Sequence, residues 1–236
     1  MESKKNKTHF FNEVYTKKDR YIKPKEIFIN LIKILKKEKL NKTKSLIDIG
    51  CASGELLFNL NRNFENLNLT GLDVDKKLIL KARDKCPKSI KFMTGDISKK
   101  IKNVGKFDII ILSGVMSIFD NGDKIMTNLF SILKPNGRIF IFESLNIYSF
   151  NLYIKSEEIR KKKKDIWFKN MYSTQFFKDT AKRFKKRCKF FEFRLKADLK
   201  KNKKNLRLGW TEILSKKKIV TNGLGIIQNQ FWIKIY

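Results

Sequence analysis

The stretch from Leu46 to Glu55 constrains the fold more than any other part of the chain, and it reads Leu-Ile-Asp-Ile-Gly-Cys-Ala-Ser-Gly-Glu. Residues 46–49 are apolar except for Asp48, which is typical of a short buried strand. The small residues at 50–54 predict a turn, and the leucines after them predict a helix. A strand, a glycine turn and a helix in this order bring backbone N–H groups and a helix N-terminus close to a ligand.

An acidic residue, Asp73, lies nineteen residues beyond Gly54 at the end of a second apolar run. A carboxylate in this position is placed to bind ribose hydroxyls. A dinucleotide site would need Gly-x-Gly-x-x-Gly, but counting from Gly50 its later glycines would be Ala52 and Glu55. The pattern therefore excludes that fingerprint, and an ordinary strand–turn–helix without a ligand remains as the alternative.

The same stretch resembles the first motif of class I S-adenosylmethionine (SAM)-dependent methyltransferases, Asp-x-Gly-x-Gly-x-Gly. Asp48, Gly50 and Gly54 match that motif, and Ala52 replaces its middle glycine. The family's acid that meets the adenine amino group is matched by Asp96. The resemblance spans roughly residues 25–145 and implies SAM as the cofactor. It implies these cofactor-binding residues: Asp48, Gly50, Cys51, Ala52, Gly54, Asp73, Val74, Asp96, Ile97 and Ser113.

Strands and helices are expected to alternate through the first 145 residues, which favours an α/β fold with a parallel sheet. Expected helices cover 25–39, 75–85, 124–133 and 173–187, with Asp75 and Ser173 as expected N-caps. Expected strands cover 46–49, 67–72, 90–93, 107–112 and 138–143, with a turn at 134–137. The resemblance implies a Rossmann-like sheet of seven strands, mostly parallel, with the last strand antiparallel. Residues 190–195 and 231–236 are the expected final pair, and residues 208–212 and 218–221 are expected to form a small extra hairpin. We expect a single domain over residues 1–236.

The first 22 residues are polar and charged with scattered aromatics. Many class I methyltransferases carry an N-terminal arm that closes over the cofactor, so the resemblance implies cofactor contacts from Tyr15 and Arg20. A frayed tail with a few aromatic anchors is the alternative. The sole histidine, His9, is a candidate general base on this arm, although an exposed tail position is the simpler interpretation.

No catalytic signature stands out, and the chemistry explains why. Methyl transfer from a sulfonium depends mainly on positioning, and a base is needed only when the acceptor must lose a proton. Glu143, at the end of an expected strand, is the second candidate base, and holding a helix or an arginine is its structural alternative.

Residues 145–207 differ from the rest in charge. Between residues 151 and 207 there are 21 Lys or Arg against 6 Asp or Glu, including the run Lys161 to Lys164. We expect a basic lid-like insertion that roofs the acceptor site, followed by the sixth strand. The net charge of +31 suggests an anionic partner such as RNA or a membrane surface. Coding bias toward lysine explains the same charge without a partner.

Other features bound the setting of the protein. No run of eighteen apolar residues is present, and no apolar segment follows the charged start, so we expect neither a membrane span nor a signal peptide. Three scattered cysteines fit a reducing cytosol and suggest no metal site. We therefore expect a cytoplasmic protein, and the sequence leaves its oligomeric state open.

Three hypotheses remain open. The first is an enzyme that methylates a small molecule or a sugar, including phosphate-bearing acceptors; the second is an RNA methyltransferase that uses residues 151–207. The third is a SAM-binding member without an acceptor site. Adenine amino groups are disfavoured because methyltransferases that act on them share an Asp/Asn-Pro-Pro-Tyr/Phe motif after the fourth strand, where residues 113–116 here read Ser-Gly-Val-Met. Cytosine C5 is disfavoured because no cysteine follows a proline.

Overall fold

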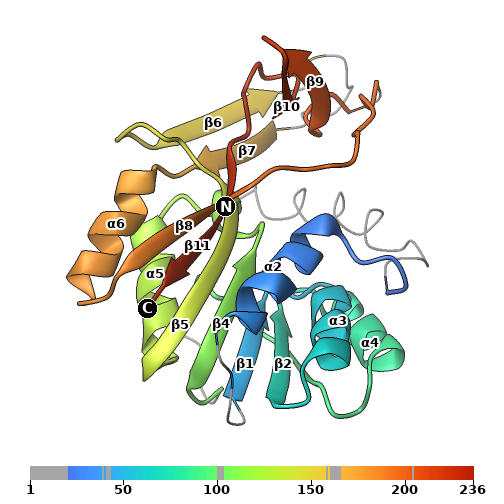
Figure 1. Ribbon diagram of the computed structural model, residues 1–236, viewed down its shortest axis with the longest axis vertical. Helices are drawn as coiled ribbons and strands as arrows, with labels where there is room; N and C mark the ends of the chain where they lie inside the picture. Colours follow the sequence, from blue (N-terminus) through green and yellow to red (C-terminus); the bar gives the residue numbers. More distant parts are fainter. Residues whose placement is uncertain are drawn as a thin grey trace.

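The computed structural model describes residues 21–38, 40, 44–99, 104–157, 159, 166–203 and 205–236. Its centre is a seven-stranded sheet of order β3-β2-β1-β4-β5-β11-β8 (Figure 1). The strands β1 to β5 pair in parallel, and β11 runs antiparallel to both of its neighbours. The expected sheet of seven mostly parallel strands is confirmed.

The elements have these bounds. The central strands are β1 (Lys44–Ile49), β2 (Leu67–Asp73), β3 (Lys91–Thr94), β4 (Phe107–Ser113), β5 (Leu133–Ser144), β8 (Cys188–Phe193) and β11 (Gln230–Ile235). The helices are α2 (Glu26–Lys36), α3 (Glu55–Asn63), α4 (Lys76–Lys85), the 3₁₀ turn η2 (Met116–Ile118), α5 (Gly122–Ser131) and α6 (Thr174–Arg183). Two further strand pairs are β6 (Leu152–Glu157) with β7 (Ile166–Met171) and β9 (Trp210–Leu214) with β10 (Lys217–Thr221).

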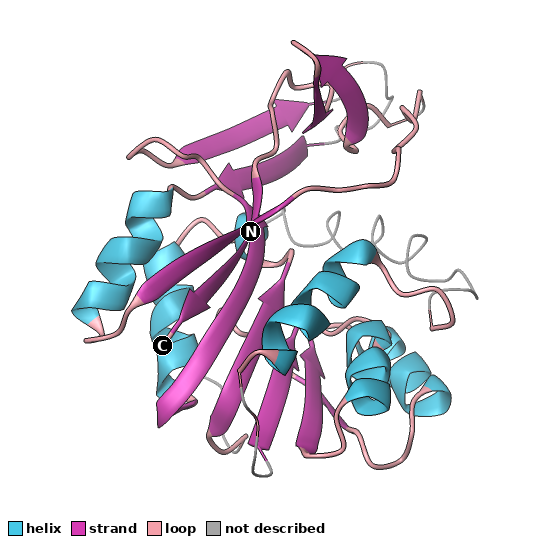
Figure 2. Ribbon diagram, viewed as in Figure 1, coloured by secondary structure: helices cyan, strands magenta, loops and turns pink. Residues whose placement is uncertain are grey.

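Helices cover both faces of the sheet (Figure 2). On one face, α2, α3 and α4 bury apolar side chains such as Leu31 and Leu57 against alternate residues of the central strands. On the other face, α5 and α6 bury Met126 and Phe177. Strands covered on both sides carry nearly continuous apolar runs, as Ile109 to Leu112 of β4 do. Because helices cover both faces of the sheet, a binding site is expected at the ends of the strands.

Local sequence signals explain where several elements begin and end. The side chain of Asp75 accepts hydrogen bonds from the backbone N–H groups of Lys77 and Leu78, which confirms its expected role as the N-cap of α4. Ser173 caps α6 in the same way through the N–H of Phe176. The helix α6 ends at Arg183, whereas the sequence predicted an end at residue 187.

The boundary between α5 and β5 was also predicted wrongly. Residues 124–133 were expected as a helix and 134–137 as a turn, but α5 ends at Ser131 and β5 begins at Leu133. The pairing register shifts there, since Phe107 pairs with Leu133 and Ile109 with Arg138. The extra residues form an irregularity within β5, and pairing with β4 extends the strand through the proline–glycine segment.

Four strands outside the central sheet, β6, β7, β9 and β10, form two separate two-stranded sheets, which we together call the cap. The cap lies beyond the C-terminal ends of the parallel strands (Figure 1). The β9–β10 hairpin confirms the small hairpin expected near residues 208–221, whereas β6 and β7 were not predicted. Within segment 145–207, α6 covers the sheet and β8 is its edge strand, so these two elements belong to the central layers. Residues 161–164 lie outside the described residues.

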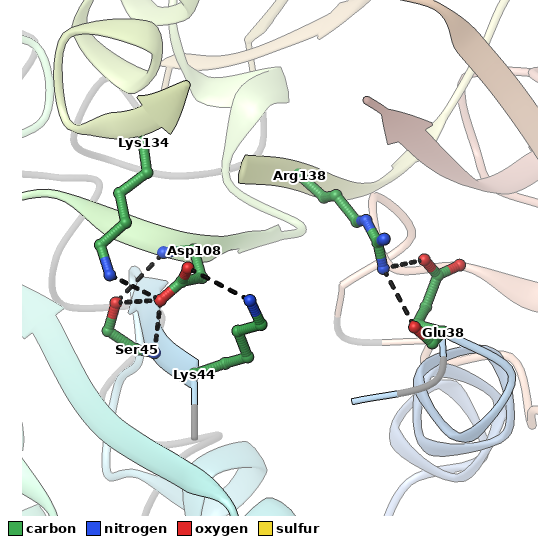
Figure 3. A network of polar contacts seen from close by, with 6 residues as sticks. All are labelled: Glu38, Lys44, Ser45, Asp108, Lys134 and Arg138. Atoms are coloured by element: carbon green, nitrogen blue, oxygen red, sulfur yellow. Dashed lines mark hydrogen bonds and ion pairs between the residues drawn. The ribbon is translucent and has the colours of Figure 1, made fainter. Parts of the chain in front are cut away.

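Acids hold the N-terminal edge of the sheet together (Figure 3). Asp108 of β4 accepts hydrogen bonds from the Ser45 backbone N–H at 2.9 Å, the Ser45 hydroxyl at 2.8 Å and the Lys134 ammonium at 2.7 Å. Burial opposes ionisation of Asp108, but these bonds outweigh it and lower its pKa to about 2. Beside this cluster, Glu38 pairs with Arg138 and Lys234. Hydrogen bonds and ion pairs therefore join several elements at this edge, and its acids have a structural role.

Candidate active site

The opposite edge of the sheet gathers most of the predicted site residues. Parallel strands end at the same edge, so residues that follow different strands come together there. The turn 50–54 follows β1, Asp73 ends β2, Asp96 follows β3 and Ser113 ends β4. The predicted base Glu143 lies one residue before the end of β5.

The turn after β1 has a backbone suited to close approach. Gly50, Ala52 and Gly54 all have positive φ angles, of 76°, 48° and 83°. A Cβ on Gly50 would lie 2.5 Å from Val115, and one on Gly54 would lie 2.9 Å from the Cys86 sulfur. Both glycines are therefore required by the packing as well as by the backbone conformation. The side chain of Cys51 is buried in the core, which leaves only its backbone for a ligand.

Asp73 links the second strand to this turn. Its Oδ2 accepts the N–H of Ala52 at 2.8 Å, and its Oδ1 accepts the N–H of Asp75 at 2.9 Å. Burial raises the pKa of Asp73, and these two hydrogen bonds partly offset that effect. Asp48, fully enclosed within β1, has a pKa raised well above its usual range by burial and by the charge of Asp73, with Lys25 opposing. Two acids thus share a low-dielectric site under the turn.

The remaining predicted cofactor residues differ in exposure. One oxygen of Asp96 accepts the backbone N–H of Ser98 at 2.9 Å and its hydroxyl at 2.6 Å, which fixes the direction of the carboxylate. Ile97 is buried in the core, whereas the side chain of Val74 is exposed. Ser113 is half-buried at the end of β4. Beside it, Gly114 has a φ of 68° and open space where a Cβ would be.

The described chain starts against the same turn. The hydroxyl of Tyr21 donates a 2.6 Å hydrogen bond to the carbonyl of Ser53, and its ring meets Phe58 edge-on. Burial raises the pKa of Tyr21 to about 12, so it remains a donor at neutral pH. The predicted arm residues Tyr15 and Arg20 and the candidate base His9 lie outside the described residues.

Glu143 lies in a buried polar cluster that connects the sheet to the cap. Its Oε1 accepts the backbone N–H of Ser117 at 3.2 Å, and its charge interacts with that of Lys169 on β7. Lys169 in turn donates to the side-chain oxygen of Gln228 at 3.2 Å, which also accepts from the Ser144 hydroxyl at 3.5 Å. Burial raises the pKa of Glu143 to about 7, with Ser117 and Lys169 opposing, and burial lowers the pKa of Lys169.

Further contacts hold the cap strand β7 over the segment that follows β4. The side-chain amide of Asn170 donates to the Phe119 carbonyl at 2.6 Å and to the Asp120 carboxylate at 3.0 Å. The Tyr172 hydroxyl donates to the same carbonyl at 2.7 Å. The cap and the ends of β4 and β5 therefore enclose one side of the site edge.

Sequence reasoning missed Lys169, Asn170 and Gln228. Their side-chain partners lie 26 to 84 residues away along the chain, and no local motif marks them. Within the described ranges, no group of three or more potential metal-binding side chains occurs, and no helix is long and apolar enough to cross a membrane.

Comparison with known proteins identifies the family. A family model described as a methyltransferase domain matches residues 40–212, which is most of the chain. The chain belongs to this family, within the class I SAM-dependent methyltransferase superfamily. Two solved structures share its fold: a SAM-dependent methyltransferase from Methanosarcina mazei and the glycopeptide N-methyltransferase MtfA in complex with SAM. The first has a TM-score of 0.57 and 12% identity over 85% of this chain and 95% of its own. The second has a TM-score of 0.51 and 10% identity over 86% and 91%.

Curated relatives match over a shorter range. The malonyl-[acyl-carrier protein] O-methyltransferase of Halalkalibacterium halodurans is 24% identical over 114 residues, covering 46% of this chain and 42% of the relative. The ubiquinone biosynthesis O-methyltransferase of Coxiella burnetii is 25% identical over 118 residues, covering 49% of each. An uncharacterized protein of Rickettsia prowazekii is 32% identical over 108 residues, covering 42% of each. The chain thus spans about half the length of the curated relatives it matches.

Proposed function

We propose that this protein is a SAM-dependent methyltransferase that acts on a small-molecule acceptor. The observation that carries the proposal is the turn 50–54. Gly50, Ala52 and Gly54 adopt left-handed backbone conformations there, and the N–H of Ala52 donates a hydrogen bond to Asp73 at the end of β2. In this proposal Asp73 binds the ribose, Asp96 meets the adenine amino group, and the turn backbone approaches the methionine part. Val74, Ser113 and the backbone of Ile97 line the same crevice, and the arm carrying Tyr15 and Arg20 closes over it.

Bound there, SAM would supply a methyl group on a sulfonium that is already activated for in-line displacement. The chain's task is then to hold the acceptor atom in line and to exclude water. Glu143 would take the acceptor's proton, because its pKa of about 7 leaves much of it ionised at neutral pH and still basic. Ser117 and Lys169 hold this carboxylate at the site edge.

The cap is proposed as the roof of the acceptor site. Its strand β7 is anchored to the segment after β4 by Asn170 and Tyr172, next to the proposed base. Two relatives are named for acceptors as different as malonyl-[acyl-carrier protein] and demethylmenaquinone, and a third is named for ubiquinone biosynthesis. Membership of the family therefore does not identify the acceptor. The basic charge of residues 151–207 favours an acceptor that carries phosphate, such as a nucleotide-linked sugar.

The test is transfer of a labelled methyl group from SAM into a cell extract that is afterwards separated into small molecules, RNA and protein. We expect label among the small molecules with the native chain, and a strong loss with Glu143→Gln while SAM affinity is unchanged. Label in the RNA fraction alone would favour the second hypothesis. Absence of label in every fraction, with SAM still bound, would favour a binding protein without an acceptor site.

RNA as the acceptor is the alternative, and the net charge of +15 between residues 151 and 207 supports it. A protein that tracks phosphates loses affinity steeply as salt rises, because bound counterions are released. If the cap roofs a small acceptor, changing Lys161 to Lys164 to serine should leave tRNA binding weak at physiological salt, as in the native chain. Filter binding at low and physiological salt measures this. Tight binding at physiological salt that the four changes destroy would replace the small-molecule proposal with the RNA enzyme.

A further inference from the structure

The β9–β10 hairpin is buried at its base and exposed at its outer end. Trp210 and Thr221, which pair at the base, are 6% and 8% exposed. Near the outer end, Ile213 and Leu214 are 71% and 51% exposed. Successive residues of a strand point to opposite faces, so both faces of this end are open within the described chain. Two aliphatic side chains therefore project from the protein.

The turn at the tip adds charge beside these aliphatics. Ser215 and Lys216 have φ angles of 47° and 64°, the mirror-image turn that asparagine and glycine usually fill. A lysine in the left-handed region is strained, yet it places an ammonium group at the tip itself. Lys217 follows and is exposed as well, and Lys218 bridges to Asp198 at 2.7 Å. The tip combines Ile213 and Leu214 with a short basic run.

We propose that this tip docks on the surface of an anionic phospholipid bilayer. The aliphatic side chains would enter the interface while Lys216 and Lys217 meet the lipid headgroups. The net charge of +31 supplies the complementary long-range attraction. Aliphatic rather than aromatic residues at the tip favour lipid over nucleic acid, because bases stack on aromatic rings.

The hairpin's place in the fold gives the docking a direction. The hairpin lies in the cap, beyond the C-terminal ends of the parallel strands (Figure 1). The backbone N–H of Gln228 donates a 2.8 Å hydrogen bond to the carbonyl of Val220 on β10. The side chain of Gln228 contacts Lys169 and Ser144. A docked tip would turn the candidate site edge toward the bilayer.

The test is co-sedimentation of the full chain with vesicles of phosphatidylcholine alone and with vesicles of equal parts phosphatidylcholine and phosphatidylglycerol. We expect binding to the anionic vesicles only. Lys216→Ser with Lys217→Ser should weaken the partition about 25-fold, from about fivefold for each lysine. Ile213→Asn with Leu214→Asn should weaken it by about tenfold or more.

Matched controls lie on α4, where Leu80 is 62% exposed and Lys76 and Lys77 are exposed. Leu80→Asn and the pair Lys76→Ser with Lys77→Ser should change the partition less than threefold, on the order of experimental scatter. Thermal unfolding checks that each variant folds, and calorimetric SAM binding reports separately on the proposed enzyme. A native chain that ignores anionic vesicles, or tip variants that bind like the controls, would overturn the proposal. So would tRNA binding that the tip changes abolish without any vesicle binding.

Discussion

The acidic residues at the two edges of the central sheet have pKa values that are shifted in opposite directions. At the N-terminal edge, Asp108 takes hydrogen bonds from Ser45 and Lys134, and its pKa falls to about 2. At the C-terminal edge, burial dominates, and it raises the pKa of Asp73 and, to about 7, that of Glu143. Both edges belong to the same strands, so the difference lies in how deeply each acid is buried and in the partners that each edge supplies.

This difference separates acids that stabilise the fold from acids available for a ligand or a proton. A carboxylate with strong cationic and hydroxyl partners gives up its stabilising bonds if it changes partner. A buried carboxylate held mainly by backbone N–H groups keeps a high proton affinity and unused acceptor capacity. Perturbed pKa values of this second kind are typical of functional sites. The contrast predicts different consequences for mutations at the two edges.

The largest expected effect concerns Ala52. Its φ of 48° lies in the left-handed region, where a β-branched side chain is strained, and its N–H binds Asp73. Ala52→Val should weaken SAM binding by at least about 100-fold, on the order of 3 kcal/mol. Ala52→Gly is the matched control and should bind normally, because glycine adopts this conformation freely. Isothermal titration calorimetry measures both, and normal affinity in the valine variant would show that the turn does not approach the cofactor.

Glu143 should make stability fall as the pH rises. Its folded pKa of about 7 exceeds the ordinary 4.5, so between those values the folded chain holds more protons than the unfolded chain. Its favourable contribution is complete below about pH 4.5 and lost above about 7, a change of about 3 kcal/mol. Glu143→Gln should remove this slope in urea unfolding measured across the window. A native chain with the same pH profile as the glutamine variant would contradict a raised pKa.

Asp73 should affect the cofactor directly. Asp73→Ala is expected to weaken SAM binding by about 1.5–3 kcal/mol, the scale of a hydrogen bond to a charged group. Asp84→Ala is a suitable control, because that side chain is 68% exposed on α4. Calorimetry on both variants decides the matter, and an unchanged affinity for Asp73→Ala would remove this residue from the ribose site.

The last prediction of this series concerns the structural edge. Because the folded pKa of Asp108 lies near 2, below the ordinary 3.8, its contribution is present above about pH 4 and lost as the pH falls through 2. Asp108→Asn should cost about 2 kcal/mol of stability at neutral pH and leave SAM affinity unchanged. Asp123→Asn, at an exposed ion pair with Arg183, serves as the control. Weakened SAM binding in a folded Asp108→Asn variant would contradict the claim that this acid has a purely structural role.

Short-range patterns predicted the parallel half of the molecule well. These patterns depend on neighbours a few residues apart: the segment around Asp48 and Gly50, the helix N-cap Asp75, and the alternation of strands and helices. The helix through residue 133 was wrong because pairing with β4 recruits the Leu133 segment into β5, a tertiary contact that no local pattern expresses.

The acceptor side was predicted only in outline. The sequence identified Glu143 as a candidate and segment 145–207 as distinct, but it did not predict β6 and β7. It also gave no signal for Lys169 or Gln228, whose contacts join elements far apart in the chain. Polar residues that act through long-range pairs look like ordinary surface residues until the fold brings them together.

The most direct test of the central claim is a crystal structure of the chain with S-adenosylhomocysteine. We expect the ribose within hydrogen-bonding distance of Asp73, the adenine beside Asp96 and the amino-acid part against the turn 50–54. Electron density for the ligand at any other place, or none at saturating ligand, would contradict this expectation.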